Sequence, residues 1–288
     1  MARSDVVPAP VLVVGAVASV QSGAAVATRL FPAVGPGGAV FLRLFVSALL
    51  LIALARPRLR GTARRDLVVV VTFGLVLAAM NAMFYLSLAR IPLGVAVTVE
   101  FLGPLGVAIV GSRRAIDVMW IVIAAIGVVL LAGGGGHLDI VGVLLAAAAG
   151  VCWGSYILLS QRVGGAFEGL TGLAIALSVA GVAIAPYGIV TGGSHLLRPS
   201  VFGKGAAVAV LSSAVPYSLE LAALRRLKAS LFGVLMSLEP AVGALSGLLF
   251  LNQHLRLHEW LAVAAVMVAS VGATVTGSPS GEPAEVLG

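Results

Sequence analysis

The sequence predicts an all-α integral membrane protein with ten transmembrane helices, arranged as two inverted five-helix repeats. Three observations lead to this fold class: the composition, the recurrence of long apolar runs and a likeness between the two halves. Hydrophobic residues make up 60% of the 288 residues, charged residues only 10%, and the mean hydropathy is +1.13. A soluble domain carries roughly a quarter charged residues, so the composition excludes a soluble globular protein.

Ten apolar runs approach the length of about 20 residues that crosses a hydrocarbon core about 30 Å thick. Gly, Pro and charged residues separate the runs. The first is longer than a typical signal core and further spans follow it, so we interpret it as an uncleaved helix. The ten runs are 9–30, 38–55, 67–88, 91–111, 116–133, 140–161, 169–191, 204–223, 229–250 and 258–276.

The two halves of the chain resemble each other. Shifted by 136 positions, residues 88–111 match residues 224–247 at six of 24 positions. The shift spans five helices, and an odd number places the second copy upside down. This predicts two five-helix domains, 9–133 and 140–276. Inverted repeats are typical of alternating-access transporters, whose substrate site lies near the membrane midplane.

The basic residues predict the orientation. Of the 18 Lys and Arg residues, twelve fall in segments on the N-terminal side of the membrane, five fall on the other side, and Arg43 lies inside a span. This excess predicts that both termini are cytoplasmic, including a polar, disordered tail at 277–288. The pI near 10.5 reflects these short loops and does not indicate nucleic-acid binding. The single cysteine, Cys152, allows no internal disulfide.

Two acids lie in the middle of apolar runs. Glu100 has nine uncharged residues on each side. A charge at a helix centre costs about 2.5–3.5 kcal/mol, so such residues usually face a cavity and act there. Pro104 follows four residues later, and Glu239 directly precedes Pro240. A proline ring displaces the carbonyl four residues before it. The alternative interpretation is a proline kink with a tolerated, protonated acid.

We predict that Glu100 and Glu239 bind substrate and couple transport to protons. Burial disfavours the charged form of a carboxyl, which brings protonation within reach. An ammonium group entering the site would displace that proton, so that substrate and proton compete for one carboxylate.

Two further charged residues lie inside spans. Arg43, about five residues into the second span, could hold a substrate carboxylate or could extend to the membrane surface. Glu220 lies nearer the cytoplasmic end of its span, where it could pair with Arg225 or Arg226 or could act in the cavity, and we favour the pairing.

Four uncharged side chains complete the candidate site. Trp153 and Tyr156 are three residues apart and therefore share a helix face, which could wall a cavity, pack, or lie at the membrane interface. Asn81 is a candidate for binding substrate, although mid-span amides such as Asn81 and Gln21 more often form interhelical hydrogen bonds.

Other motifs do not indicate chemistry. The GGGG at 133–136 lacks a following Gly-Lys-Ser/Thr and predicts a turn. His254 and His258 are four apart, but no third ligand is evident. The sequence therefore predicts no metal, no cofactor and no enzyme activity. An intramembrane lipid-processing enzyme would fit the spans, but it should show clustered catalytic groups.

Three stretches resemble a known family. They are NAMFYLSLARIPLGVAVTVEFLGPLGVAIVGSRR, CWGSYILLSQR and AVPYSLELAALRRLKASLFGVLMSLEPAVGALSGLLFL. They resemble the EamA family of the drug/metabolite transporter superfamily, and within it the RhtA-type threonine/homoserine exporters. The resemblance implies ten helices in two inverted repeats, a bacterial inner-membrane location, and proton-coupled efflux of small amino acids. Asn252 and Gln253 stand where that family usually carries Gly-Glu.

These observations together predict a secondary active exporter of small amino acids such as threonine or homoserine. Its expected partners are the amino-acid substrate, protons and the lipid bilayer, with no nucleic acid. A broader exporter of amino-acid analogues or other metabolites is the alternative. The sequence does not specify an oligomeric state.

Overall fold

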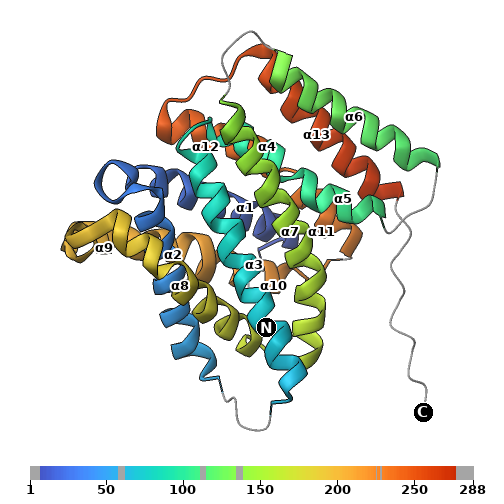
Figure 1. The fold of residues 1–288 in the computed structure, drawn as a ribbon. Coiled ribbons are helices and arrows are strands. Elements are labelled where there is room, and N and C mark those ends of the chain that lie inside the picture. The colour runs from blue at the N-terminus through green and yellow to red at the C-terminus, as the bar shows by residue number, and fades with distance from the viewer. Residues whose placement is uncertain are drawn as a thin grey trace, which may run out of the picture.

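A computed structural model describes residues 7–57, 62–110, 115–133, 139–224, 226–227 and 229–276. Within these ranges every regular element is helical (Figure 1). Seven segments are long and apolar enough to cross a bilayer: Ala9–Thr28, Phe31–Ala55, Arg64–Leu88, Ile140–Ala166, Thr171–Leu197, Leu231–Leu251 and Leu257–Thr276. The prediction of an all-α integral membrane protein is confirmed at this level. The predicted turn after Gly133 and the predicted tail at 277–288 lie outside the described residues.

Seven predicted spans coincide with single helices. A short 3-10 helix, η1 (Gly193–Leu197), follows one of them, α8. These helices are α1 (Ala9–Thr28), α2 (Phe31–Ala55), α3 (Arg64–Leu88), α6 (Ala115–Gly133), α7 (Ile140–Ala166), α8 (Thr171–Gly192) and α13 (Leu257–Thr276). The second begins earlier than predicted because it continues across a break at Gly35, where φ is +68°. Glycine adopts this left-handed conformation at little steric cost.

The other three predicted spans are interrupted. Residues 91–111 form α4 (Leu93–Glu100) and α5 (Leu102–Val110). Residues 204–223 belong to α9 (Pro199–Ala209), a π-helical turn η2 (Val210–Ala214) and α10 (Val215–Leu224). Residues 229–250 form α11 (Ala229–Met236) and α12 (Glu239–Leu251).

Prolines account for these interruptions. Pro104 has no N–H to donate to the Glu100 carbonyl, and the helix divides at Phe101. In η2 the Val215 N–H donates to the Val210 carbonyl, which sets a register of five residues. The next donor in that register would be Pro216, which has none. The Ser19 hydroxyl of α1 donates instead to the Leu211 carbonyl at 2.7 Å.

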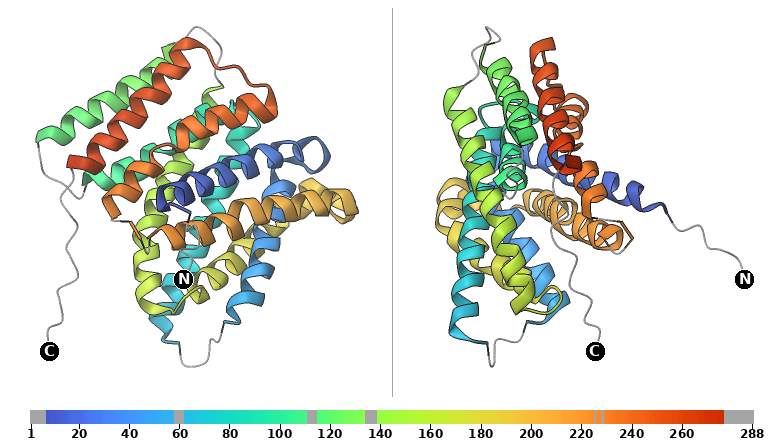
Figure 2. Two further views of the ribbon diagram at one scale, coloured as in Figure 1. Left: turned by 180° about the vertical axis from the view of Figure 1, so that it is seen from behind. Right: turned by 90° about the vertical axis from the view of Figure 1, so that its right-hand side faces the viewer.

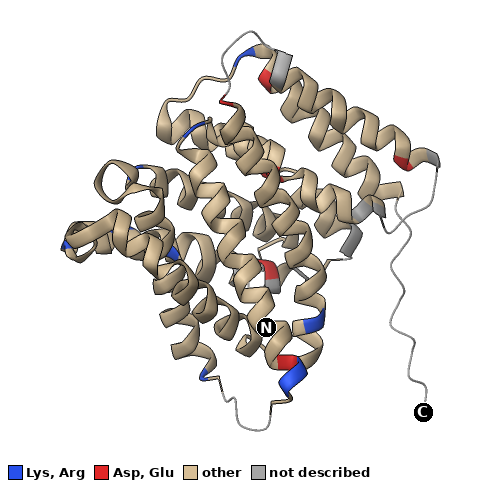
Figure 3. Ribbon diagram, in the orientation of Figure 1, with Lys and Arg blue, Asp and Glu red and all other residues tan. Residues whose placement is uncertain are grey.

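The helices pack in pairs that join distant parts of the sequence. The most extensive contacts are between α2 and α8, between α3 and α7, and between α6 and α13. The last pair forms one edge of the molecule in both views of Figure 2. Helix α1 packs against α10 and α12, and α4 packs against both α7 and α12. The charged residues lie mostly at the ends of helices, with few in the middle of the bundle (Figure 3).

Small residues allow α4 and α5 to approach their neighbours closely. A Cβ on Gly103 would lie 1.9 Å from the Gly150 carbonyl oxygen, and a Cβ on Gly150 would lie 2.6 Å from the Glu100 carbonyl oxygen. A Cβ on Gly94 would lie 2.6 Å from the Cα of Ala244. Such contacts are typical of helix packing in lipid, where small residues let backbones meet. They fix the position of Glu100 against α7.

Asn252 and Gln253 at the end of α12 have a structural role. Asn252 ends α12 in the left-handed conformation, with φ +53°, which Asn tolerates better than most residues. The Leu93 N–H, at the start of α4, donates to Gln253 Oε1 at 2.9 Å. The Arg29 guanidinium also donates to the Phe250 carbonyl. Both contacts join the first half of the chain to the end of α12.

An ion pair joins the α3–α4 connection to the start of α7. Arg90 Nη1 lies 2.7 Å from Asp139 Oδ2. Asp139 Oδ1 accepts hydrogen bonds from the N–H groups of Val141 and Gly142, and so caps α7. The hydrogen bond from Arg90 lowers the pKa of Asp139 below its ordinary value. This acid is therefore ionised at neutral pH and complements the helix N-terminus.

The Gly103–Gly150 contact generates a stability prediction. Gly103→Ala should destabilise the protein by about 1–3 kcal/mol, because overpacking a close contact forces the backbones apart. The effect is measured as the melting temperature in detergent, with size-exclusion chromatography after heating to detect the protein that stays folded. Gly106→Ala is the matched control on the same helix, since nothing lies within 4 Å of a Cβ there. Equal melting temperatures for the two variants would contradict the prediction.

Candidate functional site

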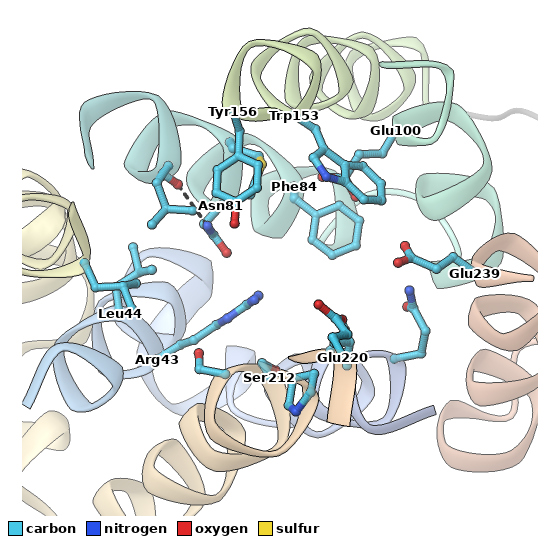
Figure 4. A pocket seen from close by; sticks show the side chains of 18 of the residues that line it. Arg43, Leu44, Asn81, Phe84, Glu100, Trp153, Tyr156, Ser212, Glu220 and Glu239 are labelled. Atoms are coloured by element: carbon cyan, nitrogen blue, oxygen red, sulfur yellow. Dashed lines mark hydrogen bonds between the residues drawn. The ribbon is translucent and has the colours of Figure 1, made fainter. Parts of the chain in front are cut away.

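A cavity of about 180 Å³ lies between the helices that carry the predicted site residues. Helices α1, α2, α3, α4, α7, α8, α10, α11 and α12 contribute to its wall, as does the turn η2. Figure 4 shows side chains converging on this space from several sides. All six residues predicted to bind substrate line it: Arg43, Asn81, Glu100, Trp153, Tyr156 and Glu239. The structure thus brings together residues that are up to 196 positions apart in sequence.

Two helix breaks place the predicted acids. Glu100 is the last residue of α4 and Glu239 is the first residue of α12. Both are largely buried, with 8% and 6% of their surface exposed. Neither has a hydrogen-bond or ion-pair partner among the described residues. Their free carboxyl groups are therefore available to a bound molecule or proton.

The electrostatic surroundings of the two acids differ. A helix carries about half a positive charge at its N-terminus and half a negative charge at its C-terminus. The two helix dipoles therefore act on these acids in opposite senses: the start of α12 attracts negative charge and the end of α4 attracts positive charge. Glu239 also lies within electrostatic range of Glu100 and Glu220.

A third acid, Glu220, also lines the cavity. Its side chain points into the space from α10 (Figure 4). Arg226 Nη1 donates instead to the Val7 carbonyl at 3.4 Å, and Arg225 lies outside the described residues. The expected pairing of Glu220 with Arg226 is therefore not found. The sequence pattern favoured a local ion pair because it could not show that α10 turns this face inward.

Arg43 extends from α2 into the cavity, on the side opposite Glu239 (Figure 4). Its guanidinium lies 5.7 Å from the centre of the Tyr85 ring, and Nη1 lies 3.5 Å from the Tyr85 hydroxyl. This arrangement stabilises a cation over the aromatic face. Arg43 is also within electrostatic range of Glu100. Of the two alternatives that the sequence left open for Arg43, the structure has the side chain pointing into the cavity and not extending to the membrane surface.

Aromatic residues form one wall of the cavity. Trp153 packs edge-on against Phe101, with ring centres 5.6 Å apart and an interplanar angle of 76°. Tyr156 stacks on Phe73 at 4.9 Å. Phe101 occupies the break between α4 and α5, so the same proline-linked break positions Glu100 and supports Trp153. The two aromatic residues lie at the cavity rather than at a membrane-interface belt.

The polar residues of the wall fall into bonded and unbonded groups. Asn81 Nδ2 donates to the Leu77 carbonyl at 2.8 Å, a bond within its own helix rather than between helices as expected. Ser213 shares a 2.8 Å hydrogen bond with Ser47 of α2. Gln21 Oε1 and Ser212 Oγ are buried and have no hydrogen-bond partner in the described structure.

Sequence reasoning missed Ser212 and Ser213. A signal was present: Ser212 precedes Pro216 by four residues, the same spacing that separates Glu100 from Pro104. In both cases the proline disrupts the helix at the residue that faces the cavity. Phe84, which lies between Trp153 and Glu220 in Figure 4, was also missed, because an apolar residue in an apolar span carries no signal.

The arrangement suits a small molecule with both a positive and a negative group. Acids approach the cavity from three helices, and one guanidinium faces them. The volume exceeds the roughly 10–15 Å³ that one water requires, and it lies below the roughly 300–1,000 Å³ typical of drug-sized ligand sites. A small zwitterion fits these limits.

Comparisons with known proteins agree with this geometry. Residues 140–275 match the EamA-like transporter family. The threonine/homoserine exporter RhtA of Salmonella typhimurium is 44% identical over 264 residues, covering 91% of this chain and 89% of that protein. RhtA of Escherichia coli K12 is 44% identical over 269 residues, covering 92% and 91%. A crystal structure 22% identical in sequence shares the fold, with a TM-score of 0.64, and the match covers 93% of this chain and 97% of that one.

The unpartnered acids generate a prediction on stability. Glu100→Gln and Glu239→Gln should each keep the wild-type melting temperature within about 2 °C, because no bonded contact is lost. Ser237→Ala is the contrasting control. It removes a buried 2.7 Å hydrogen bond to Ser270 and should lower the melting temperature. A large loss of stability in the amide variants would show that the acids hold the fold together.

Proposed function

The chain belongs to the EamA-like transporter family, and from this premise we propose that it exports threonine, homoserine or similar small amino acids. The relatives that support the proposal are named as threonine/homoserine exporters and match almost the whole chain. Transport would be secondary active, with the substrate leaving the cytoplasm through the central cavity. The alternative is an exporter that accepts a broader range of substrates, including amino-acid analogues.

One observation carries the proposal: Arg43 and Glu239 point into the same cavity from opposite sides (Figure 4). An amino acid is a zwitterion, with its carboxylate and ammonium groups on one carbon. Arg43 would bind the carboxylate and the acids would bind the ammonium group, with charge-assisted hydrogen bonds in both cases. Trp153 and Tyr156 would contact the apolar part of the side chain.

We further propose that a proton and the substrate compete for Glu100. The end of α4 favours a positive charge at this residue, and both a proton and an ammonium group supply one. Arrival of the ammonium group would release the proton, and departure of the substrate would allow protonation again. Glu239, at the start of α12, would be the second acid to meet the ammonium group.

The proposed architecture is ten spans in two inverted repeats, residues 9–133 and 140–276. The packing supports it. If α1 to α3 correspond to α7, α8 and α9–α10, the contact of α3 with α7 should be matched by one of α10 with α1, and it is. The contacts α5–α7 and α12–α1 correspond in the same way. We place both termini in the cytoplasm and the protein in the inner membrane.

The role of Arg43 can be tested by substitution. Arg43→Lys should lose about tenfold or more of the threonine flux into proteoliposomes, because a point charge does not replace a planar, two-pronged guanidinium. The measurement is uptake of labelled threonine and homoserine by purified protein. Arg90→Lys, outside the cavity, is the matched control and should keep wild-type flux. Full transport by the Arg43 variant would exclude its role in carboxylate binding.

Proton coupling has its own test. Glu100→Gln should abolish the stimulation of flux by a pH gradient, because the amide can neither release nor take up a proton. Flux with and without the gradient is compared for wild type, Glu100→Gln and Glu239→Gln at equal protein content. Gradient-dependent transport that survives in the Glu100 variant would overturn this assignment and leave Glu239 as the candidate.

A further inference from the structure

We propose that Gln21 and Ser212 form a subsite that recognises the hydroxyl group of the substrate, an inference that rests on the function proposed above. Neither residue is charged, so neither is needed to hold a zwitterion. Both residues line the cavity, and each has a buried polar atom without a hydrogen-bond partner in the described structure. Together they supply what a hydroxy-amino acid needs beyond its ammonium and carboxylate groups.

Gln21 presents an acceptor. Its side chain lies on α1 with only 3% of its surface exposed, and Oε1 has no partner in the described structure. Leaving a buried polar atom unpaired is costly, so such atoms usually have a partner, a water or a ligand. An amide oxygen accepts but cannot donate, and therefore requires an O–H or N–H group from whatever occupies the cavity.

The unpartnered hydroxyl of Ser212 lies within the π-helical turn. Other serines of this bundle donate to the carbonyl four residues earlier, as Ser178 does to Ala174 and Ser218 to Ala214, both at 2.7 Å. Ser212 lies within η2, is 4% exposed, and makes no such bond. Single π-helical turns of this kind are frequent at functional sites.

The turn around Ser212 is nevertheless held in place from both sides. Ser19 of α1 bonds the Leu211 carbonyl at 2.7 Å, and Ser47 of α2 bonds Ser213 at 2.8 Å. Gly23 of α1 allows the close approach, since a Cβ there would lie 2.3 Å from Ser212 Oγ. The neighbours of Ser212 are thus fixed while its own hydroxyl stays unbonded, as expected of a group positioned for a ligand.

The charged groups decide which part of the substrate these residues take. Three carboxylates, Glu100, Glu220 and Glu239, attract an ammonium group more strongly than a neutral amide does. Arg43 attracts the carboxylate. The hydroxyl remains, and it can donate to Gln21 Oε1 or exchange hydrogen bonds with Ser212 Oγ. An amino acid without a hydroxyl would leave these buried atoms unpaired, which is how a site rejects the analogue lacking it.

The choice of test compounds isolates the hydroxyl. Threonine and homoserine both become 2-aminobutyrate when the hydroxyl is replaced by hydrogen, so one compound is the control for both. The measurement is uptake of labelled homoserine into proteoliposomes in the presence of each unlabelled compound. For wild-type protein, we expect unlabelled threonine or homoserine to inhibit this uptake at a concentration at least about tenfold lower than the concentration of 2-aminobutyrate that gives the same inhibition.

Gln21→Met and Ser212→Ala should each reduce this ratio several-fold by weakening inhibition by the hydroxy-amino acids while leaving that by 2-aminobutyrate unchanged. In Gly23→Ala the new methyl group would displace the Ser212 hydroxyl. This variant should therefore act like Ser212→Ala, although the hydroxyl itself is still present. Ser87→Ala is the matched control, because Ser87 Oγ is also buried and unpartnered but does not line the cavity. It should keep the wild-type ratio.

The outcomes separate the two proposals. An unchanged ratio in both Gln21→Met and Ser212→Ala would overturn the hydroxyl subsite while threonine transport by wild type stands. Equal weakening of all three compounds would also overturn it, because the residues would then bind the ammonium or carboxylate group. Failure of wild-type protein to transport either hydroxy-amino acid would instead refute the proposed function.

Discussion

The loss of a backbone donor at proline is the constraint on which the cavity depends. In a bilayer no water replaces a missing hydrogen bond, so a proline in a span must be accommodated by protein. Pro104 divides one span at Glu100, and Pro216 is accommodated by a π-helical turn that holds Ser212. Glycines on neighbouring helices then approach these points closely enough to fix them. The polar residues of the site therefore sit where the helices are irregular, because irregular backbone is tolerated only against protein or a cavity.

The two acids beside prolines are similar in sequence but differ in structure. Glu100 closes a helix and Glu239 opens one, so the helix dipoles act on them in opposite senses. The two residues are also offset by three positions in the match between the halves of the sequence. The same kind of side chain thus enters one cavity from opposite helix ends, and the two acids need not have the same role in the proposed transport.

The sequence was sufficient to predict the class of the fold, because apolar runs of membrane length admit few alternatives. It also identified six residues that line one cavity, because charged and polar groups in apolar spans are conspicuous against their background. It was weaker where geometry decides. Glu220 was assigned to a neighbouring arginine because both lie near the cytoplasmic end of the predicted span, whereas the inward face of α10 depends on packing against α1. Ser212 was overlooked because helix serines often bond to a carbonyl of their own helix, as Ser178 does, and the sequence does not show that Ser212 lacks such a bond.

The amide of Gln253 bonds the first turn of α4 to the end of α12. An amide has no proton to gain or lose in water at any pH of biological interest. This hydrogen bond between the two halves of the chain therefore keeps its strength in acid and in neutral surroundings. It differs in this from the Arg90–Asp139 ion pair, three residues before α4 begins, which is lost when the carboxylate is protonated.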